Sequence, residues 1–381
     1  MRHEAMEPPS ALGIKRVYSI EFVVDYFDRS RDFYLNKMGF VETHQSTTEW
    51  EDKFKSKAIY FSANDIKIMV SSPLTTHSYT AQYLKTLCPG IRKVVLQVKN
   101  LDRTIDYLQD HHATFVHMEK EIHSPNSRHH FITIASPIGF LEFTFLEIEG
   151  EDDEIPMFEK FSSPSDEHSP FNSIDHITIN ARTIYPIYNF FEQVMDFKKF
   201  WNVSFHTPDF KSGKKGTGLF SQVMYDPGSH VKFASNEPLH PHFNDSQIQT
   251  FVDKNHGAGI QHIALGVDDL VDTVETFRSR GIEFLTTPDT YYDLLPERMA
   301  EQNIGDLKEN LTDLKKQGIL VDGKDGKYLL QIFLKDASLL YNDESAGPFF
   351  YEFIQRCGHG GFGEGNFRAL FEAIELQEPI S

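Results

Sequence analysis

Hydrophobic and polar residues repeat along this chain in a strand–helix–strand order. The segment that begins at Ile91, IRKVVLQVKNLDRTIDYLQDHHATFV, alternates apolar and polar residues, changes to helical spacing, and then alternates again. The segment that begins at Ile260, IQHIALGVDDLVDTVETFRSRGIEFL, aligns with it without a gap. In both copies an Asn or Asp precedes the helical stretch, which is typical of a helix N-cap. Each copy therefore predicts a strand, a capped amphipathic helix and a second strand.

Two further pairs of segments extend this repeat to both halves of the chain. SIEFVVDYFDRSRDFYLNKMGF from Ser19 resembles SIDHITINARTIYPIYNFFEQVMDF from Ser173, and GFLEFTF from Gly139 more loosely resembles PFFYEFI from Pro348. Repetition of this kind indicates duplicated structural units. The predicted fold class is α+β, with two tandem domains of paired β-α-β-β-β modules. Each domain is expected to form an open barrel whose period-2 strands decide which side chains face inward.

The segment between the two halves predicts a linker, because it is acidic and rich in Ser and Pro from Glu149 to Pro170. A composition of this kind buries little apolar area. The predicted divisions are an N-terminal tail at 1–15, an N-terminal domain without metal at 16–148, a linker at 149–172, a C-terminal catalytic domain at 173–360, and a lid helix with a tail at 361–381.

Three positions that differ between the halves suggest a metal site. Aligning the repeated segments sets three pairs of residues opposite each other: His176 and Phe22, His262 and Lys93, Glu352 and Glu142. The C-terminal half thus carries two His and a Glu, the ligands of the facial triad that binds non-haem Fe(II). A single His in a strand is more often structural, but three ligand-type residues at repeat-equivalent positions are hard to explain as independent accidents. The N-terminal half is expected to bind no metal.

Composition and charge narrow the remaining possibilities. The formal net charge of −19 argues against nucleic acid and against an anionic membrane surface as partners. Two Cys in 381 residues favour a reducing compartment, and no apolar run has the length of a spanning helix. A cytoplasmic location is therefore expected. Most of the 33 Phe residues are expected in the core, with a few lining a pocket for an aromatic ligand.

Several long motifs occur in order in the C-terminal half: GAGIQHIAL from Gly257, TPDTYYDLL from Thr287, GILVDGKDGKYLLQIF from Gly318, FFYEFIQR from Phe349 and GFGEGNFRALFEAIE from Gly361. They resemble the 4-hydroxyphenylpyruvate dioxygenase family, whose fold is the vicinal-oxygen-chelate fold. The resemblance implies Fe(II) at His176, His262 and Glu352. It also implies 4-hydroxyphenylpyruvate and O2 as substrates, with the carboxylate and ketone on the iron, and homogentisate and CO2 as products of this step in tyrosine breakdown.

The same resemblance implies further site residues. Those implied for catalysis are Ser221, Asn236, Gln247 and Gln331, and those implied for the substrate wall and the C-terminal lid are Gln261, Phe333, Phe350, Phe362 and Phe367. Gln261 is the least expected of these, because in a regular strand it faces away from His262. Without the resemblance, ordinary hydrogen bonding in loops or at strand edges is the preferred explanation for Ser221, Asn236 and Gln247. A homo-oligomer, either a dimer or a tetramer, is also expected.

Alternatives remain open at this level. 4-Hydroxymandelate synthase shares the fold, the metal and the substrate, although the Asn236-Glu237-Pro238 run and Phe333 favour the ring-hydroxylating branch. A non-catalytic protein that binds an aromatic ligand on the same fold and an extradiol dioxygenase are two further possibilities. The GHGGFGEGNF stretch lacks the Lys-Ser/Thr of a phosphate loop. His129 and His130, in the half without a triad, are expected to be solvated.

Overall fold

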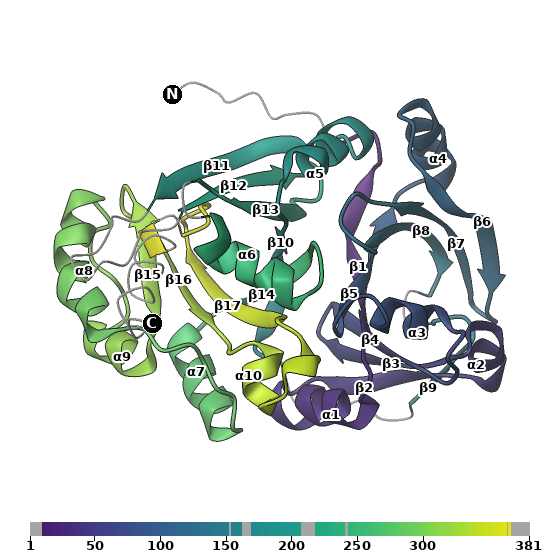
Figure 1. The fold of residues 1–381 in the computed structure, drawn as a ribbon, viewed down its shortest axis with the longest axis horizontal. Coiled ribbons are helices and arrows are strands. Elements are labelled where there is room, and N and C mark those ends of the chain that lie inside the picture. Colours follow the sequence, from purple (N-terminus) through teal and green to yellow (C-terminus); the bar gives the residue numbers. More distant parts are fainter. Residues whose placement is uncertain are drawn as a thin grey trace.

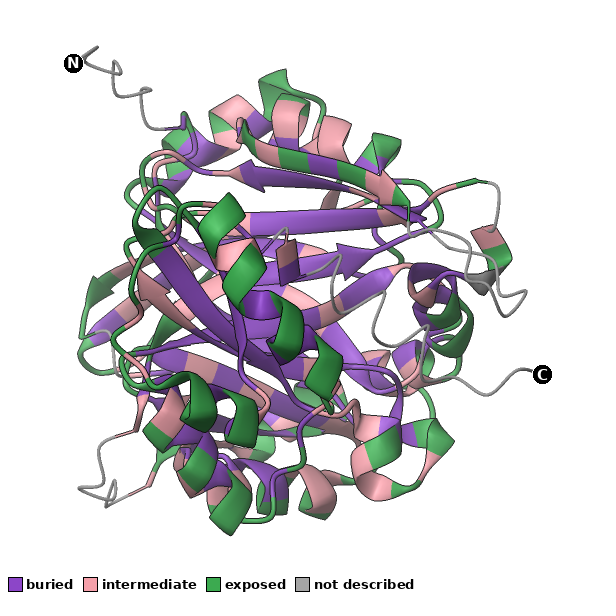
Figure 2. Ribbon diagram, turned by 90° about the vertical axis from the view of Figure 1, so that its left-hand side faces the viewer, coloured by how far each residue is buried: buried purple, intermediate pink, exposed green. Residues whose placement is uncertain are grey.

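Two strongly curved β-sheets lie side by side, one from each half of the chain (Figure 1). The computed structural model describes residues 10–151, 154–161, 169–206, 218–240, 243–363 and 365–366. Helices cover the outer faces of the sheets and expose their polar sides, while the strands are mostly buried (Figure 2). None of the helices within these residues has the length and apolar character needed to cross a membrane.

The N-terminal sheet has nine strands. Its strands are β1 (Ile14–Val23), β2 (Val41–Ser46), β3 (Ser56–Ala63), β4 (Ile66–Pro73), β5 (Gly90–Val98), β6 (Phe115–His123), β7 (Ser127–Ala135), β8 (Glu142–Gly150) and β9 (Phe158–Lys160). Its helices are α1 (Phe27–Asp32), which continues into a π-helical turn (Phe33–Lys37), α2 (Thr48–Phe54), α3 (Tyr79–Leu84) and α4 (Leu101–Asp110).

The C-terminal sheet has eight strands. They are β10 (Phe171–Asn180), β11 (Lys198–His206), β12 (Gly218–Tyr225), β13 (Lys232–Pro238), β14 (Gly259–Val267), β15 (Leu320–Lys324), β16 (Lys327–Phe333) and β17 (Phe350–Cys357). The helices of this half are α5 (Tyr185–Asn189), which continues into a π-helical turn (Phe190–Val194), α6 (Gln247–Lys254), α7 (Leu270–Ser279), α8 (Asp289–Glu301), α9 (Leu311–Gln317) and α10 (Ala337–Tyr341).

The two sheets share one topology, which confirms the predicted repeat. The N-terminal order is β6-β7-β8-β5-β1-β4-β3-β2-β9, and the C-terminal order, read from its other end, is β15-β16-β17-β14-β10-β13-β12-β11. In each sheet two central strands are antiparallel, and each of them has a parallel strand on its outer side. Each half is therefore a pair of β-α-β-β-β modules, and the α+β fold class is correct.

Local sequence signals account for the ends of the repeated helices. The side chain of Asn100 accepts a hydrogen bond from the Arg103 amide at the start of α4, and Asp269 accepts one from the Asp272 amide at the start of α7. These are the N-caps that the two aligned segments predicted. Asp325 and Gly326 join β15 to β16 with positive φ angles of 54° and 77°, as a tight hairpin turn requires.

The strand register corrects two of the three residue pairs that the sequence alignment set opposite each other. In the C-terminal sheet, Ala264 pairs with His176 on one side and with Glu352 on the other. In the N-terminal sheet, the equivalent residue Val95 pairs with Ser19 and with Thr144. The N-terminal counterparts of the candidate ligands are therefore Ser19, Lys93 and Thr144. The sequence alignment had assigned Phe22 and Glu142 as counterparts, which is wrong by three and two residues. Short strands of similar sequence can be aligned in several registers.

The predicted linker contains structure that belongs to the N-terminal sheet. Strand β9 pairs with β2, and the ring of Phe158 lies 5.0 Å from that of Tyr60 and 5.5 Å from that of Trp50. Ile155 is also buried. These few apolar side chains attach an otherwise acidic segment to the sheet. The polar composition of the segment concealed them.

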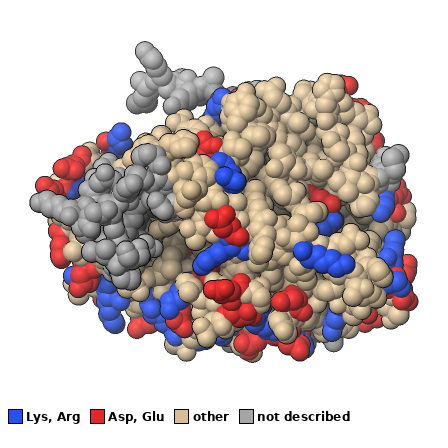
Figure 3. All heavy atoms as spheres, viewed as in Figure 1, with Lys and Arg blue, Asp and Glu red and all other residues tan. Residues whose placement is uncertain are grey.

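A shared aromatic core joins the two halves. The hydroxyl groups of Tyr34 and Tyr351 are 2.8 Å apart, and the ring of Phe143 packs on that of Phe233 at 5.6 Å. His129, expected to be solvated, is 6% exposed and faces the inside of the N-terminal sheet. On the face shown in Figure 3, acidic and basic side chains are interspersed and form no single large patch.

Candidate metal centre

Three neighbouring strands of the C-terminal sheet bring the candidate ligands together. His176 lies on β10, His262 on β14 and Glu352 on β17. Ala264 of the middle strand pairs with both His176 and Glu352, and its methyl side chain leaves the space between them open. Period-2 alternation then places His262 on the same face, two residues along β14.

The geometry of these three side chains fits a metal ion. One ligand atom from each residue lies within 4.8 Å of the other two. Oε2 of Glu352 is 3.2 Å from Nε2 of His262 and 3.5 Å from Nε2 of His176, and all three residues are at most 3% exposed. Oε1 of Glu352 and Nε2 of His262 are buried without a hydrogen-bond partner. Unpaired buried groups are costly, and a cation bound between them would satisfy both. Two imidazoles and a carboxylate form a ligand set for a divalent transition metal.

Hydrogen bonds orient both imidazoles with Nε2 toward this point. Nδ1 of His176 donates to Oδ1 of Asp175 at 2.8 Å, and Nδ1 of His262 donates to Oε1 of Gln261 at 3.0 Å. Arg356 holds Asp175 in turn through two bonds of 2.5 and 2.7 Å. Such partners fix the tautomer of a ligating His and raise its basicity.

Sequence reasoning missed Asp175 and Arg356. Asp175 precedes His176 directly, so its position beside a candidate ligand was the available signal. Arg356 is 181 residues from Asp175, and only the fold brings them together. Gln261, which was expected to face away from His262, reaches the imidazole with its side-chain oxygen.

Electrostatics prepare the carboxylate to be charged. Burial alone raises the pKa of Glu352, but the two neighbouring imidazoles outweigh it and hold that pKa below its usual value. Burial works against charge on His176, yet Glu352 and Asp175 raise its pKa above the ordinary value. Burial lowers the pKa of His262. A charged Glu352 beside a neutral His262 suits metal binding, because ligands bind in their deprotonated forms.

Aromatic rings surround the three ligands. Phe350 stacks on the His262 imidazole at 5.0 Å, and Phe333 lies edge-on to it at 6.1 Å. Phe362 lies 4.9 Å from the His176 ring and stacks on Trp201 at 5.9 Å. The predicted wall residues Phe333, Phe350 and Phe362 therefore do gather at the triad. They form a mainly apolar lining of the kind that an aromatic ligand requires.

Predicted polar residues lie on the strands around the triad. Gln331 is 1% exposed, and its Oε1 has no hydrogen-bond partner. A Cβ at Gly363 would lie 2.2 Å from that oxygen, so the chain after Phe362 passes directly over Gln331. Asn236 donates to Asn180 at 3.0 Å and pairs across the sheet with Ser221. All three predicted residues, Gln331, Asn236 and Ser221, are buried.

Two predicted residues are not placed at the triad by the structure. Gln247 opens α6 and is partly exposed, whereas the buried glutamine of that turn is Gln249, which donates to Asp253 at 2.7 Å. Phe367 lies outside the described residues, as does most of the predicted lid helix. Both assignments stay predictions.

Comparisons with known proteins agree with the repeat and with the site. The family model of the Glyoxalase/Bleomycin resistance protein/Dioxygenase superfamily matches residues 16–154 and 173–299. The 4-hydroxyphenylpyruvate dioxygenase of Dictyostelium discoideum is 34% identical over 363 residues, which cover 91% of this chain and 93% of the relative. That of Pseudomonas aeruginosa is 32% identical over 355 residues, which cover 90% and 87%.

A solved structure supports the fold independently. A triple mutant of 4-hydroxymandelate synthase from Streptomyces coelicolor superposes with a TM-score of 0.80 over 96% of this chain and 99% of that chain. The sequence identity is 22%, so this likeness shows the fold alone. Two superfamily repeats, a buried pair of His with a Glu, and identity to curated relatives over nine-tenths of the sequence lead to one conclusion: the chain belongs to the 4-hydroxyphenylpyruvate dioxygenase family.

Proposed function

We propose that this protein is an Fe(II)-dependent dioxygenase that converts 4-hydroxyphenylpyruvate and O2 to homogentisate and CO2. The reaction balances without another reductant, because both oxygen atoms of O2 are incorporated and the 2-oxo acid loses its carboxyl carbon as CO2. The observation that carries the proposal is the convergence of His176, His262 and Glu352 within 4.8 Å in a buried, aromatic-lined interior.

The three ligands suit iron for a geometric reason. His176, His262 and Glu352 would hold Fe(II), and the bound ion would leave positions open for substrate and O2 chemistry. Asp175 and Gln261 hold the imidazoles so that Nε2 points inward. Arg356 holds Asp175, and it also donates to the backbone oxygens of His359 and Gly361 at 2.9 and 2.8 Å. The same arginine therefore links the orientation of His176 to the chain segment that leads to Phe362.

The surrounding residues supply binding and exclusion of water. Phe333, Phe350 and Phe362 offer apolar faces for the phenyl ring of the substrate, and they keep water from the ligands. The unpaired Gln331 oxygen can accept a hydrogen bond from the phenol hydroxyl. Asn236 and Ser221 are buried partners on β13 and β12, and we propose that they bind polar atoms of the substrate. Gln247 and Phe367 are proposed substrate contacts on the family resemblance alone.

The test is product identification with iron-loaded protein. The chain is loaded with Fe(II) anaerobically, mixed with 4-hydroxyphenylpyruvate and O2, and its products are identified by mass spectrometry. Homogentisate with one CO2 for each O2 is the expected result. His262→Ala is expected to lose turnover, whereas His123→Ala, which changes a surface histidine of the N-terminal sheet with a 66% exposed side chain, retains it.

Other products would assign a different function. 4-Hydroxymandelate would move the chain to the benzylic-hydroxylating reaction. Ring-opened product from a catechol without any oxo acid would indicate an extradiol dioxygenase. Tight binding of 4-hydroxyphenylpyruvate without O2 uptake would indicate a non-catalytic binding protein.

A further inference from the structure

The N-terminal sheet encloses a chamber at the place that the metal centre occupies in the other half. Its volume is about 480 Å³. Ser19, Lys93 and Thr144, the register counterparts of the three metal ligands, all line it. A space of this size is within the ~300–1,000 Å³ range of small-molecule sites. The repeat has therefore kept an interior cavity although the residues that would bind a metal are absent.

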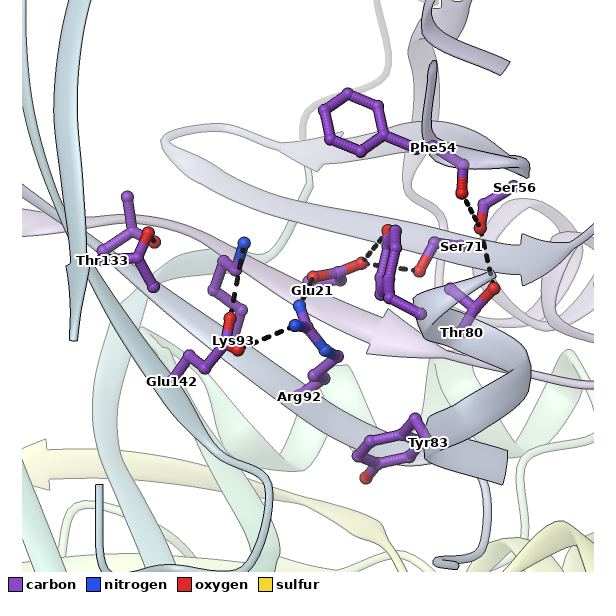
Figure 4. Close-up of polar contacts among 12 residues, drawn as sticks. Glu21, Phe54, Ser56, Ser71, Thr80, Tyr83, Arg92, Lys93, Thr133 and Glu142 are labelled. Atoms are coloured by element: carbon purple, nitrogen blue, oxygen red, sulfur yellow. Dashed lines mark hydrogen bonds and ion pairs between the residues drawn. The ribbon is translucent and has the colours of Figure 1, made fainter. Parts of the chain in front are cut away.

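A cluster of four charged residues, Glu21, Arg92, Lys93 and Glu142, lies at this N-terminal chamber (Figure 4), and the first three of them line it. Arg92 bridges two carboxylates, at 3.4 Å from Glu21 and 2.8 Å from Glu142. Tyr79 and Ser71 donate to Glu21 at 2.5 and 2.8 Å. Glu21 is 1% exposed, so these partners are needed to stabilise its charge. The two cations and two anions of the cluster balance each other.

Lys93 is the member of this cluster that is left with bonding capacity. Its ammonium lies 3.7 Å from Glu142, which is an ion-pair distance beyond normal hydrogen-bond length. The side chain is 24% exposed, and it lines the chamber. An ammonium group has three donors. Lys93 can therefore donate to an acidic group of a molecule inside the chamber while it keeps its long contact with Glu142.

Another part of the lining is aromatic. Trp50 from α2, Tyr60 from β3, Phe131 from β7 and Phe158 from β9 all line the chamber. Phe158 packs between Trp50 and Tyr60, so these rings support one another. Flat apolar surfaces that share a cavity with a donor are suited to a ring that carries a polar substituent at one end.

The charges around the chamber favour an anion. Among the described residues that line it are five cationic side chains and one carboxylate, that of Glu21. Lys53 and Lys55 are exposed at the end of α2, and Lys120 of β6 is partly exposed. In a chain with a net charge of −19 this is a local reversal of sign. A cationic rim of this kind raises the local concentration of anions and steers them inward.

We infer that the N-terminal chamber is a second ligand site, which binds a small aromatic carboxylate with its acidic group at Lys93 and its ring against Trp50 and Phe131. Fixed positive charge here takes the role that a metal has in the other half, which is to hold the anionic end of an aromatic acid. The inference does not depend on the activity of the metal centre. Binding at this chamber requires no iron and no oxygen.

The position of Trp50 provides a direct test. The chain has two Trp residues, so a Trp201→Phe background leaves Trp50 as the single indole reporter. Metal-free protein in this background is titrated with phenylacetate, and phenylacetamide serves as the neutral isostere. A saturable change in Trp50 emission with phenylacetate, and a much weaker response to phenylacetamide, are expected.

Substitutions then locate the bound molecule. Lys93→Met removes the ammonium but keeps most of the chain length, and it is expected to weaken phenylacetate binding about tenfold or more. Lys99→Met, on an exposed lysine outside the chamber, leaves binding unchanged. Val95 lies on β5, two residues from Lys93, and also lines the chamber. Val95→Phe fills part of the chamber without altering a charge, and it is expected to abolish phenylacetate binding. This second variant keeps the test decisive if Lys93→Met does not fold.

Two results would overturn the inference. One is the absence of any saturable Trp50 response to phenylacetate, which would mean that the chamber holds only water. The other is equal affinity in the parent and in folded Lys93→Met or Val95→Phe protein, which would place the ligand elsewhere. Loss of dioxygenase turnover in any of these proteins has no bearing on either result, so failure of the proposed function remains distinguishable.

Discussion

The two halves of this molecule differ in their interiors far more than in their scaffolds. Apart from β9, strand order and strand direction correspond, and the repeated helices α4 and α7 have equivalent caps. His176, His262 and Glu352 of one half are replaced by Ser19, Lys93 and Thr144 in the other. The C-terminal interior brings together three ligand atoms that could hold a metal, whereas the N-terminal interior holds a cavity lined by charged side chains.

The supporting residues have changed together with the ligands. By the same register, Tyr18 is the counterpart of Asp175, Ile148 that of Arg356, and Arg92 that of Gln261. Ile148 has no side-chain donor to replace Arg356, and Arg92, the counterpart of Gln261, instead neutralises Glu21 and Glu142. A metal centre depends on this outer set of residues as well as on its direct ligands. The N-terminal half keeps the same barrel, because its hydrophobic core requires neither the metal ligands nor the residues that support them.

The largest expected effect is on metal content. His176→Ala removes a direct ligand. Because the loss of a residue that only supports a ligand costs about 10–100-fold in metal affinity or activity, this change is expected to cost more than about 100-fold in both. Ser19→Ala, the matched change in the other half, leaves the metal content at that of the parent. Metal analysis of the purified proteins after Fe(II) loading tests both statements. Equal metal content in parent and His176→Ala would refute the proposed triad.

The next largest effect is expected on the stability of the N-terminal half. Arg92→Met leaves Glu21 and Glu142 without their shared cation, and breaking a buried ion pair in this way costs about 3 kcal/mol of unfolding free energy. Denaturant unfolding at pH 7 measures the loss. Arg128→Met is the surface control, because Arg128 also bridges two carboxylates, Glu121 and Glu149, but in contact with solvent. A much smaller loss is expected there.

The pH dependence of Arg92→Met sharpens this prediction. In the parent, burial raises the pKa of Glu21, but Arg92 and Lys93 outweigh it and hold that pKa below its usual value. Without Arg92 the balance shifts toward burial and the pKa rises. The carboxyl group of the variant then takes up a proton as the pH falls, which removes the buried charge. The difference in stability between parent and variant is therefore expected to shrink between pH 7 and pH 4.5. An unchanged difference would show that the loss is one of packing alone.

A smaller effect is expected from Asp175→Asn. The amide oxygen can still accept from Nδ1 of His176, but the negative charge that supports the imidazole and pairs with Arg356 is lost. Metal affinity is expected to fall by about 10–100-fold, as measured by anaerobic titration with Co(II). Asp268→Asn, an exposed aspartate that accepts a hydrogen bond from Asn172, is the control. Affinity equal to that of the parent in Asp175→Asn would show that the Asp175 charge does not support the site.

The sequence predicted the repeat and the triad because both depend on local patterns. Asn100 and Asp269 precede helical spacing, and each ligand lies on a short strand whose inner face is set by alternation. The pairing of Glu352 with Ala264 and not with an adjacent residue depends on register, which hydrogen bonds between distant strands decide. For that reason the counterparts Ser19 and Thr144 were misassigned.

Contacts between distant residues could not be predicted in the same way. Arg356 reaches Asp175 across 181 residues, and Phe158 attaches an acidic segment to a sheet that begins more than a hundred residues earlier. The N-terminal chamber also had no sequence signal. Glu21, Arg92 and Lys93 look like ordinary surface charges until the curvature of the sheet turns them inward.

The smallest expected effect tests whether the two scaffolds are equivalent. Asn100→Ala and Asp269→Ala each remove a helix cap at corresponding positions, and each is expected to cost about 1 kcal/mol of unfolding free energy. Urea unfolding of metal-free protein can follow the halves separately, because Trp50 lies in α2 and Trp201 in β11. Asn100→Ala should lower the midpoint seen by Trp50, and Asp269→Ala the one seen by Trp201. If the halves unfold together, both variants should shift both signals by the same amount. If one variant loses several times more unfolding free energy than the other, the helix of that half contributes more to stability. The two halves would then share a topology but differ in stability.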